Sequence, residues 1–405
     1  MVAPVVNPAV GGMRPLDNRG LTQPAREQIT PTATPASRRW ALLDQLRKVT
    51  ARKSHRMCAR YTIDGAAEVG RRAATKTEVC KQTGRRVEVS NGHRATVSNV
   101  IMCDSALCPV CNARKRAGQL EALAQSTEHV DGSVVLVTLT VPHDRKTRLA
   151  DMLDAMAKAW NSAMSARAKQ AWEALGMVGW FRALDYTHGN NGHHPHYHAV
   201  LYFSGQVDRQ TWERVWWDTR HRWSNSIERS LGRRPDNKGQ DAQEAQDRHA
   251  VRDYAVKAMA MDALWSEGKD LGGDTIWQVL ASTIRGPHQR RVWEEIESAT
   301  YRRRWVTAGG CVNLKPPEPD DEDDEDDDED DEVEPVMSIP RDLWGWLVVG
   351  GLVPRLLSDV ERGDPQRIAR WRALAVVGDA TEDRATWRAW LPDWLPKQPQ
   401  PKVTQ

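Results

Sequence analysis

The sequence contains no long hydrophobic run, and no stretch approaches the roughly 20 apolar residues of a membrane-spanning helix. The first residues lack the basic region and apolar core of a secretory signal. A glycine-rich phosphate-binding loop, a helicase signature and internal repeats are also missing. These absences exclude an integral membrane protein and a nucleotide-driven motor, and they predict a cytoplasmic location.

Cysteine is scarce, with six residues in 405, and in a cytoplasmic protein we do not expect a disulfide framework. Three of the six nevertheless lie within nine residues, at Cys103, Cys108 and Cys111. This Cys-x4-Cys-Pro-x-Cys spacing predicts a structural zinc site. We expect Cys80 to be the fourth ligand, with His93 as the alternative. Cys58 and Cys311 stand apart, and we expect them to be ordinary residues.

The formal net charge of +2 conceals two regions of opposite sign. Residues 320–332 are 13 consecutive acidic residues, flanked by Glu318 and Glu334. Outside these 15 acids the chain has 57 basic and 40 acidic residues, a net charge of +17. An acidic block repels itself and predicts an extended linker, whereas the basic remainder is typical of a nucleic-acid-binding protein.

Two histidines, His196 and His198, stand two residues apart at the start of a hydrophobic run that predicts a β-strand. Side chains two apart in a strand share a face, so both imidazoles can bind one divalent metal ion. Residues 178–187 predict a second strand, and the Gly-Asn-Asn-Gly reversal at 189–192 predicts an antiparallel hairpin. Asp185 then lies near the level of His196, where a carboxylate completes a His-His-Asp site.

Three segments, in this order, resemble the motifs of the HUH endonucleases, in particular the rolling-circle replication initiators of prokaryotic plasmids and related mobile elements. They are Thr138-Leu139-Thr140-Val141-Pro142-His143, Pro195-His196-Tyr197-His198 and Tyr254-Ala255-Val256-Lys257. The resemblance covers roughly residues 75–310, and the cysteine arrangement is similar to that of a group found in actinobacteria. It implies a ferredoxin-like or related palm, an α+β fold whose active site lies on the open face of the sheet.

The resemblance implies that His196, His198 and a third residue bind Mg²⁺ or Mn²⁺, and that Tyr254 is the nucleophile of DNA cleavage. Its attack gives a 5′-phosphotyrosine and releases a 3′-hydroxyl, which primes rolling-circle replication. Lys257 lies one helical turn beyond Tyr254, where we expect it to hold phosphate or to lower the pKa of the tyrosine. One subgroup has an acidic residue four positions before the nucleophile, but this position is Ala250.

The third metal ligand has three candidates. Asp185 is our first choice, His143 the second and His188 the third, because the family takes this ligand from a neighbouring strand and the residue differs between subgroups. His143 is alternatively a contact to the substrate phosphate. His193 and His194 fall near the predicted turn, where we expect them to be exposed to solvent.

Several basic residues are expected to contact DNA. They are Arg114, Lys115, Arg302, Arg303 and Arg304. Tyr301 precedes the second group and is the rival to Tyr254 as nucleophile. Most of the 18 tryptophans are expected in the core, but Trp293 and Trp305 lie among arginines and are candidates for stacking on unpaired bases.

Apolar residues at helical spacing predict one helix over 147–175 and another that begins after an N-cap at Asp208. With the strands, the pattern of elements predicts an α+β fold, an antiparallel sheet with helices on one side. The predicted divisions are a disordered N-terminus (1–37), a helix with a cysteine-rich zinc-binding module (38–120), the HUH endonuclease domain (121–315), an acidic disordered linker (316–335) and a small Trp-rich helical region (336–405).

The expected partners are single-stranded and duplex origin DNA, a host helicase and a host polymerase, with no membrane. Two alternatives remain open. The same motifs serve transposases and relaxases of mobile elements. In the second alternative, the chain is a non-catalytic, zinc-dependent DNA-binding regulator with a structural histidine pair. Such a regulator would bind duplex DNA without cutting it and would tolerate loss of Tyr254.

Overall fold

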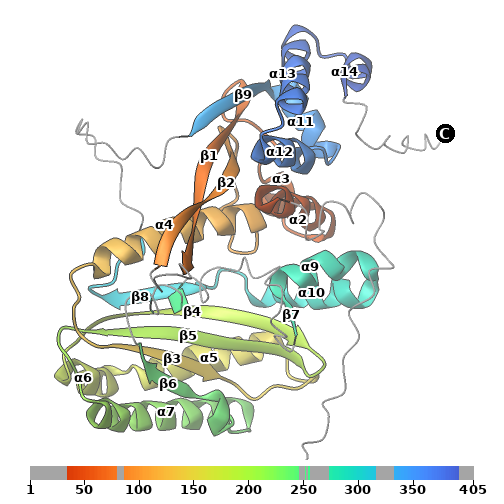
Figure 1. Ribbon diagram of the computed structural model, residues 1–405. Helices are drawn as coiled ribbons and strands as arrows, with labels where there is room; N and C mark the ends of the chain where they lie inside the picture. Colours follow the sequence, from red (N-terminus) through yellow and green to blue (C-terminus); the bar gives the residue numbers. More distant parts are fainter. Residues whose placement is uncertain are drawn as a thin grey trace, which may run out of the picture.

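The computed structural model describes residues 34–79, 86–245, 251, 254–255, 273–315 and 333–391. These residues form a mixed α+β fold with antiparallel sheets, which confirms the predicted fold class. Figure 1 shows a larger sheet with its helices in the lower part of the molecule and a smaller sheet with its helices in the upper part. Cys80, Lys257 and the acidic run at 320–332 lie outside the described residues.

The larger sheet has six strands in the order β6-β3-β5-β4-β7, with β8 also paired to β4. Every pair is antiparallel. The strands are β3 (Val134–Thr140), β4 (Met177–Gly189), β5 (Gly192–Phe203), β6 (Asp241–Glu244), β7 (Asp274–Thr275) and β8 (Val306–Gly310). The predicted hairpin is therefore present as β4 and β5.

One face of this sheet is covered by helices. They are α5 (Leu149–Ala163), α6 (Ala166–Ala174) and α7 (Arg209–Leu231), with α9 (Ile276–Ser282) and α10 (Pro287–Ala299) at one end. Alternate strand residues such as Leu139 and Leu201 pack with Met156 and Trp223 of these helices in the main core. The other face carries a smaller cluster that includes Phe181.

Residues at the helix ends determine where these helices begin and end, and the structure differs from the sequence prediction in one helix. The predicted N-cap, Asp208, accepts a hydrogen bond from the Thr211 backbone N–H at 3.0 Å, and α7 ends at Gly232 with a left-handed φ of 70°. The continuous helix expected over 147–175 is instead two helices, α5 and α6, because Ser165 has an extended backbone. The buried Trp172 of α6 donates its indole N–H to Thr219 of α7 at 2.9 Å, which anchors the second helix.

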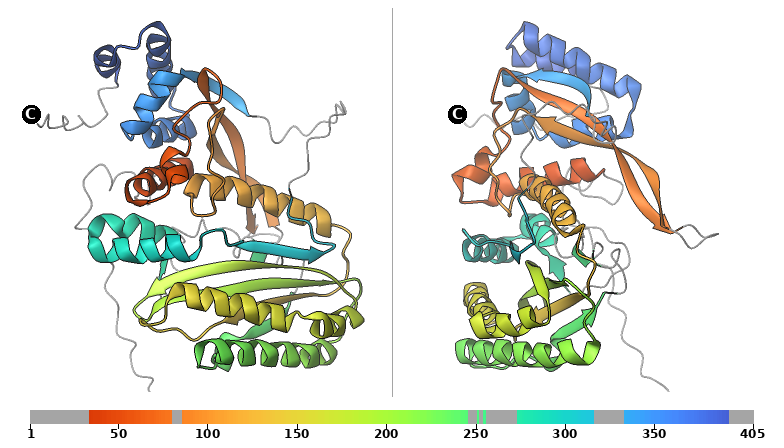
Figure 2. Two further views of the ribbon diagram at one scale, coloured as in Figure 1. Left: turned by 180° about the vertical axis from the view of Figure 1, so that it is seen from behind. Right: turned by 90° about the vertical axis from the view of Figure 1, so that its left-hand side faces the viewer.

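The smaller sheet joins the two ends of the described chain. Its strands are β1 (Ala66–Val79), β2 (Arg86–Ser98) and β9 (Glu334–Pro340), in the order β2-β1-β9. Around it lie α2 (Pro35–Val49), α3 (Lys53–Met57), α4 (Pro109–Thr127), α11 (Arg341–Val349), α12 (Val353–Arg362), α13 (Pro365–Ala380) and α14 (Arg384–Trp390). Figure 2 shows the long β1–β2 hairpin leading away from these helices.

The C-terminal helices pack on the N-terminal ones. The Trp344 indole N–H donates to the Ala59 carbonyl at 3.0 Å, and the rings of Trp344 and Trp40 lie edge to face at 5.7 Å. The predicted helices of residues 336–405 are thus present up to 390, but they belong with β9 to a unit that includes residues 35–100. Among the described residues no single helix is long and apolar enough to cross a membrane; α11 and α12 meet that test only together, bent by 103°.

Candidate active site and metal centre

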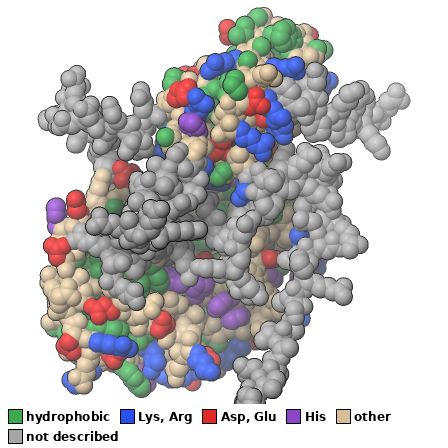
Figure 3. All heavy atoms as spheres, viewed as in Figure 1, with side chains coloured by type: hydrophobic (Ala, Val, Ile, Leu, Met, Phe, Trp, Pro, Cys, Tyr) green, Lys and Arg blue, Asp and Glu red, His purple; other side chains and the backbone are tan. Residues whose placement is uncertain are grey.

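Asp185, His196 and His198 form a compact group on the β4–β5 hairpin. In the strand register Asp185 pairs with His196, as predicted. The Asp185 Oδ2 atom lies 3.2 Å from His196 Nε2 and 3.7 Å from His198 Nε2. One ligand atom from each residue lies within 4.8 Å of the other two, so the group can hold a metal ion. Figure 3 shows histidine side chains gathered on this face of the molecule.

The short turn between the strands sets this register. Only Asn190 and Asn191 separate β4 from β5, and Gly192 has a φ of 87°, which favours glycine. A Cβ at Gly192 would lie 2.9 Å from the Asp144 carbonyl oxygen, so the turn also packs tightly against the loop after β3. The close approach fixes the level at which Asp185 faces the histidines.

Charge balance in the group favours the ionised carboxylate. Burial raises the pKa of Asp185, but the adjacent imidazoles of His196 and His198 outweigh burial and hold the pKa below its usual value. A carboxylate with two imidazoles is a donor set that suits Mn²⁺, whereas Mg²⁺ prefers oxygen ligands. The residues present therefore fit a divalent ion of this kind.

Tyr254 reaches the same group from the opposite side of His198. Its hydroxyl donates to the Val137 carbonyl at 2.7 Å and lies 2.9 Å from His198 Nδ1 and 3.2 Å from Thr138 Oγ1. Since the hydroxyl proton is used by Val137, we assign the His198 proton to Nδ1, which leaves the Nε2 lone pair available to a metal. Burial raises the pKa of Tyr254, although the hydrogen bond with Thr138 opposes it.

The other histidines lie beside the group rather than in it. His143 stacks on His194 with ring centroids 4.4 Å apart, and His194 stacks on His196 at 5.2 Å. The pKa of His194 is lowered to about 4, mainly by burial and in addition by the charges of His196 and His143. His188 contacts His193 at 5.1 Å instead of the group.

Our expectation that His193 is exposed in the turn is wrong. The strand begins at Gly192 and takes in the residues that we expected near the turn, so His193 belongs to β5 and is buried. Its Nδ1 lies 2.7 Å from the Tyr186 hydroxyl and its Nε2 lies 3.1 Å from Glu295 of α10. These contacts tie the end of the hairpin to α10.

The rival tyrosines do not join the metal group in the described part of the chain. Tyr301 is 53% exposed at the end of α10, where the Arg52 guanidinium lies 4.1 Å from its ring centre. Tyr202 shares the face of His198 but is buried in the smaller cluster. Lys257 lies outside the described residues and stays a prediction.

The predicted DNA contacts differ in accessibility. Arg114 and Lys115 are exposed on α4, and Arg302 and Arg304 are exposed before β8. Arg303 is half-buried and donates to Asp154 of α5 at 2.8 Å. The two tryptophan candidates, Trp293 and Trp305, are 0% and 4% exposed, so the expectation that they stack on bases is wrong. Their apolar rings contribute to the main core instead.

A second group of four cysteines lies near the smaller sheet and α4. Its members are Cys58, Cys103, Cys108 and Cys111, and one sulfur from each lies within 4.8 Å of the others. Cys58 Sγ is 3.6 Å from Cys108 Sγ and 3.5 Å from Cys111 Sγ. Four thiols at this separation can hold a metal ion.

Cys58 corrects our sequence interpretation. We expected it to be an ordinary residue, but it lies in the loop after α3, and the fold brings it to the Cys-x4-Cys-Pro-x-Cys segment from 45 residues away. Cys80 lies outside the described residues. His93 is exposed on β2, where it pairs with Ala73, and is not in the group. Spacing alone did not distinguish Cys58 from Cys80.

The chain is similar in sequence to known replication proteins. The Rep_1 family, described as "Replication protein", matches residues 94–339, and no solved structure matches the chain. "Protein rep" of Streptomyces lividans is 31% identical over 133 residues, which cover 25% of this chain and 29% of that protein. "Protein rep" of Lentilactobacillus hilgardii is 26% identical over 157 residues, 35% of this chain and 48% of that protein. The alignments thus span less than half of either relative. Since the family match covers more than half of the sequence, this chain belongs to the replication protein family.

Proposed function

We propose that this protein is a replication initiator that cuts one strand of origin DNA through a covalent tyrosine intermediate. The observation that carries the proposal is the 2.9 Å contact between the Tyr254 hydroxyl and His198, a member of the Asp185-His196-His198 group. A nucleophile beside a metal-binding group suits cleavage of a phosphodiester, because the first attacks phosphorus while the second stabilises the charge that develops.

Asp185, His196 and His198 would hold Mg²⁺ or Mn²⁺. When bound, the ion neutralises charge that gathers on the phosphate oxygens. The Tyr254 oxygen attacks phosphorus, and the bond from phosphorus to the 3′ oxygen breaks. Tyr254 loses its phenolic proton and the leaving 3′ oxygen gains one, so the products are a 5′-phosphotyrosine and a free 3′-hydroxyl primer.

The tyrosine must change its contacts before it attacks. Its proton points to the Val137 carbonyl, which is not a base, and burial holds the hydroxyl protonated. Entry of the DNA strand would displace the hydroxyl from Val137, while the Nδ1 proton of His198 keeps the ring oriented for its metal. Exposed Arg114, Lys115, Arg302 and Arg304 would contact phosphates, a salt-dependent contribution to affinity.

The cysteine group would hold a structural zinc ion, which would connect the loop after α3 to the start of α4. Because α4 leads into β3, which carries Thr138 and Val137 beside Tyr254, the zinc would stabilise the approach to the active site. Host helicase and polymerase would act on the nicked product, since the chain carries no helicase signature.

Covalent capture tests the proposal. The protein is incubated with single-stranded origin DNA and saturating Mn²⁺, and denaturing gels are read for a protein–DNA adduct. We expect an adduct with the wild type and with Tyr202→Phe, a buried tyrosine on the same sheet face, but none with Tyr254→Phe. An adduct that survives in Tyr254→Phe would assign the chemistry to another tyrosine. No adduct from wild type on a verified origin would favour the regulator.

A further inference from the structure

A pocket of about 290 Å³ lies on the helix-covered side of the larger sheet, between the edge formed by β4 and β8 and the helices α5 and α6. Trp180 and Arg182 of β4 line it. They alternate with Asp185, so they project from the face opposite the metal group. Its size is at the lower end for ligand sites, which suits a small ligand.

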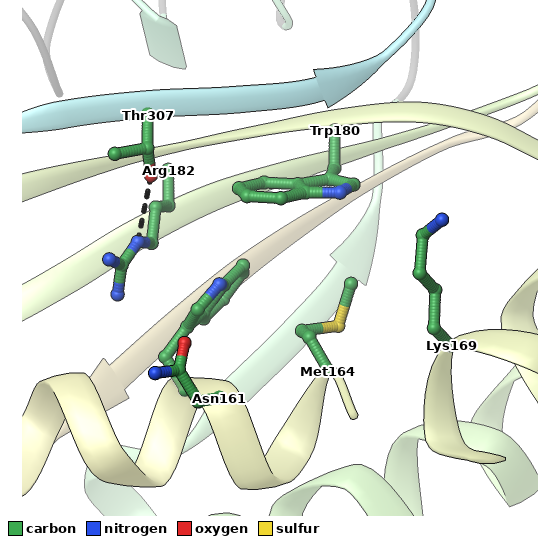
Figure 4. Close-up of a pocket in the computed structure, with 7 residues that line it drawn as sticks. Asn161, Met164, Lys169, Trp180, Arg182 and Thr307 are labelled. Atoms are coloured by element: carbon green, nitrogen blue, oxygen red, sulfur yellow. Dashed lines mark hydrogen bonds between the residues drawn. The ribbon is translucent and has the colours of Figure 1, made fainter. Parts of the chain in front are cut away.

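Trp180 offers one face of its indole to this pocket. Its other face lies against the backbone of β8, where a Cβ added to Gly309 would come within 2.9 Å of the ring nitrogen. In Figure 4 the ring is seen edge-on beneath β8, with open space between it and Met164. The Trp160 ring borders this space, with its centroid 5.2 Å from that of Trp180 and the two planes tilted by 54°. An exposed aromatic face above a hollow is a stacking platform for a planar ligand.

Arg182 supplies a positive charge whose hydrogen-bonding capacity is not fully used. Its Nε donates to Thr307 at 2.9 Å, and its guanidinium carbon lies 5.0 Å from the Trp160 ring centre and 4.3 Å from that of Tyr197. Nη1 is buried and has no hydrogen-bond partner among the described residues. A buried donor without an acceptor is costly, and an anionic ligand would satisfy it.

The mouth of the pocket adds polar groups suited to the same ligand. Asn161 of α5 is exposed there, and its amide can donate or accept a hydrogen bond. Lys169 of α6 lies at the side of the hollow (Figure 4). The Lys169 ammonium lies 2.6 Å from Glu173, at a pair about 40% exposed on each side, so solvent screens that attraction. Stacking surface, guanidinium and amide together match a planar base joined to a phosphate.

We propose that this pocket binds one nucleotide of single-stranded DNA, with the base on Trp180 and the phosphate on Arg182. The proposal rests on the proposed function, which supplies a single strand. The site would hold that strand at a point separate from the cleaved phosphate. A free nucleotide carries the same chemistry and is the other source that the test distinguishes.

Binding of a fluorescent 12-residue oligo(dT) is measured by anisotropy without divalent metal, and binding of dTMP by quenching of tryptophan fluorescence. The variants are Trp180→Leu, Arg182→Gln and Asn161→Glu, the last at an exposed position that leaves the core intact. The controls are Trp217→Leu, an exposed tryptophan on α7 beside Arg220, and Gln210→Glu, the same charge change on α7.

Loss of one stacked base should raise the Kd of the oligonucleotide by about 5-fold to 150-fold in Trp180→Leu. We expect Asn161→Glu and Arg182→Gln to weaken binding as well, with both controls unchanged. An effect on the oligonucleotide alone supports a DNA strand, whereas an effect on dTMP alone overturns the strand and assigns a free nucleotide. Unchanged binding of both probes in Asn161→Glu and Arg182→Gln, or equal loss in the controls, overturns the pocket.

Covalent capture on the same variants separates this proposal from the function on which it rests. A wild type that forms the adduct, with oligonucleotide affinity that none of the three variants changes, refutes the pocket and leaves the initiator. A wild type that forms no adduct, with affinity that depends on Trp180 and Arg182, refutes the initiator and leaves the pocket.

Discussion

Tyr254→Phe should weaken metal binding as well as abolish cleavage, because its hydroxyl supports His198. The substitution removes the acceptor 2.9 Å from His198 Nδ1, on the side of the ring opposite the metal-binding nitrogen. Loss of such a supporting hydrogen bond typically costs about 10-fold to 100-fold in metal affinity. Thr138 Oγ1 lies 3.3 Å from the same nitrogen and can accept its proton instead. We therefore expect the lower end, about tenfold, which corresponds to about 1.4 kcal/mol.

The assay is a Mn²⁺ titration followed by electron paramagnetic resonance, without DNA, so that cleavage does not contribute. Tyr202→Phe is the matched control, since Tyr202 is buried on the same sheet face and its hydroxyl is outside the metal group. Thr138→Val in the Tyr254→Phe background should lower the affinity further, because the second acceptor is then lost as well. Unchanged Mn²⁺ affinity in both Tyr254→Phe and the double variant would refute the assignment of the His198 proton to Nδ1.

Three further substitutions test other parts of the structure. Asp185→Ala should weaken Mn²⁺ binding more than Tyr254→Phe does in the same titration, because it removes a ligand rather than a support; equal effects would argue against a direct role. Cys58→Ala should lower the zinc content of the purified protein from about one ion per chain, measured by mass spectrometry, while Cys311→Ala should not; normal zinc in Cys58→Ala would contradict the four-thiol site. Burial raises the pKa of Asp44 from 3.8 to about 6 despite the nearby Arg47, so ionisation destabilises the fold as the pH rises through this range. Asp44→Asn should therefore be more stable than wild type by up to about 3 kcal/mol at neutral pH, with a smaller difference near pH 5; urea unfolding that shows the opposite pH trend would count against this burial effect.

The parts of the site that sequence reasoning predicted depend on short-range geometry. His196 and His198 share a face because strand side chains alternate, and a two-residue turn forces Asp185 opposite His196. The N-cap at Asp208 is equally local. Each of these features follows from residues within about one hairpin or one helical turn of each other.

The parts that sequence reasoning missed depend on long-range packing. Cys58 joins the other cysteines only because the end of α3 lies beside the start of α4, a proximity that no spacing rule contains. Trp293 and Trp305 have arginine neighbours in sequence, yet their rings are buried in the core while most of these arginines are exposed. Trp180 lacks arginines on both sides in the sequence, yet its ring lines a pocket together with that of Trp160.

The pairing of β9 with β1 determines how the acidic segment is attached to the rest of the protein. Lys315 follows the larger sheet, and Glu334 is held on the smaller sheet by Arg71, whose Nε lies 2.5 Å from its carboxylate. The 17 residues at 316–332 are therefore attached at both ends to described strands, β8 before them and β9 after them. The entropic cost of closing a loop rises only with the logarithm of its length, by about 0.6 kcal/mol for each doubling. The number of acidic residues can thus vary widely with little effect on folding, while their effective concentration near the basic protein is fixed by two attachments.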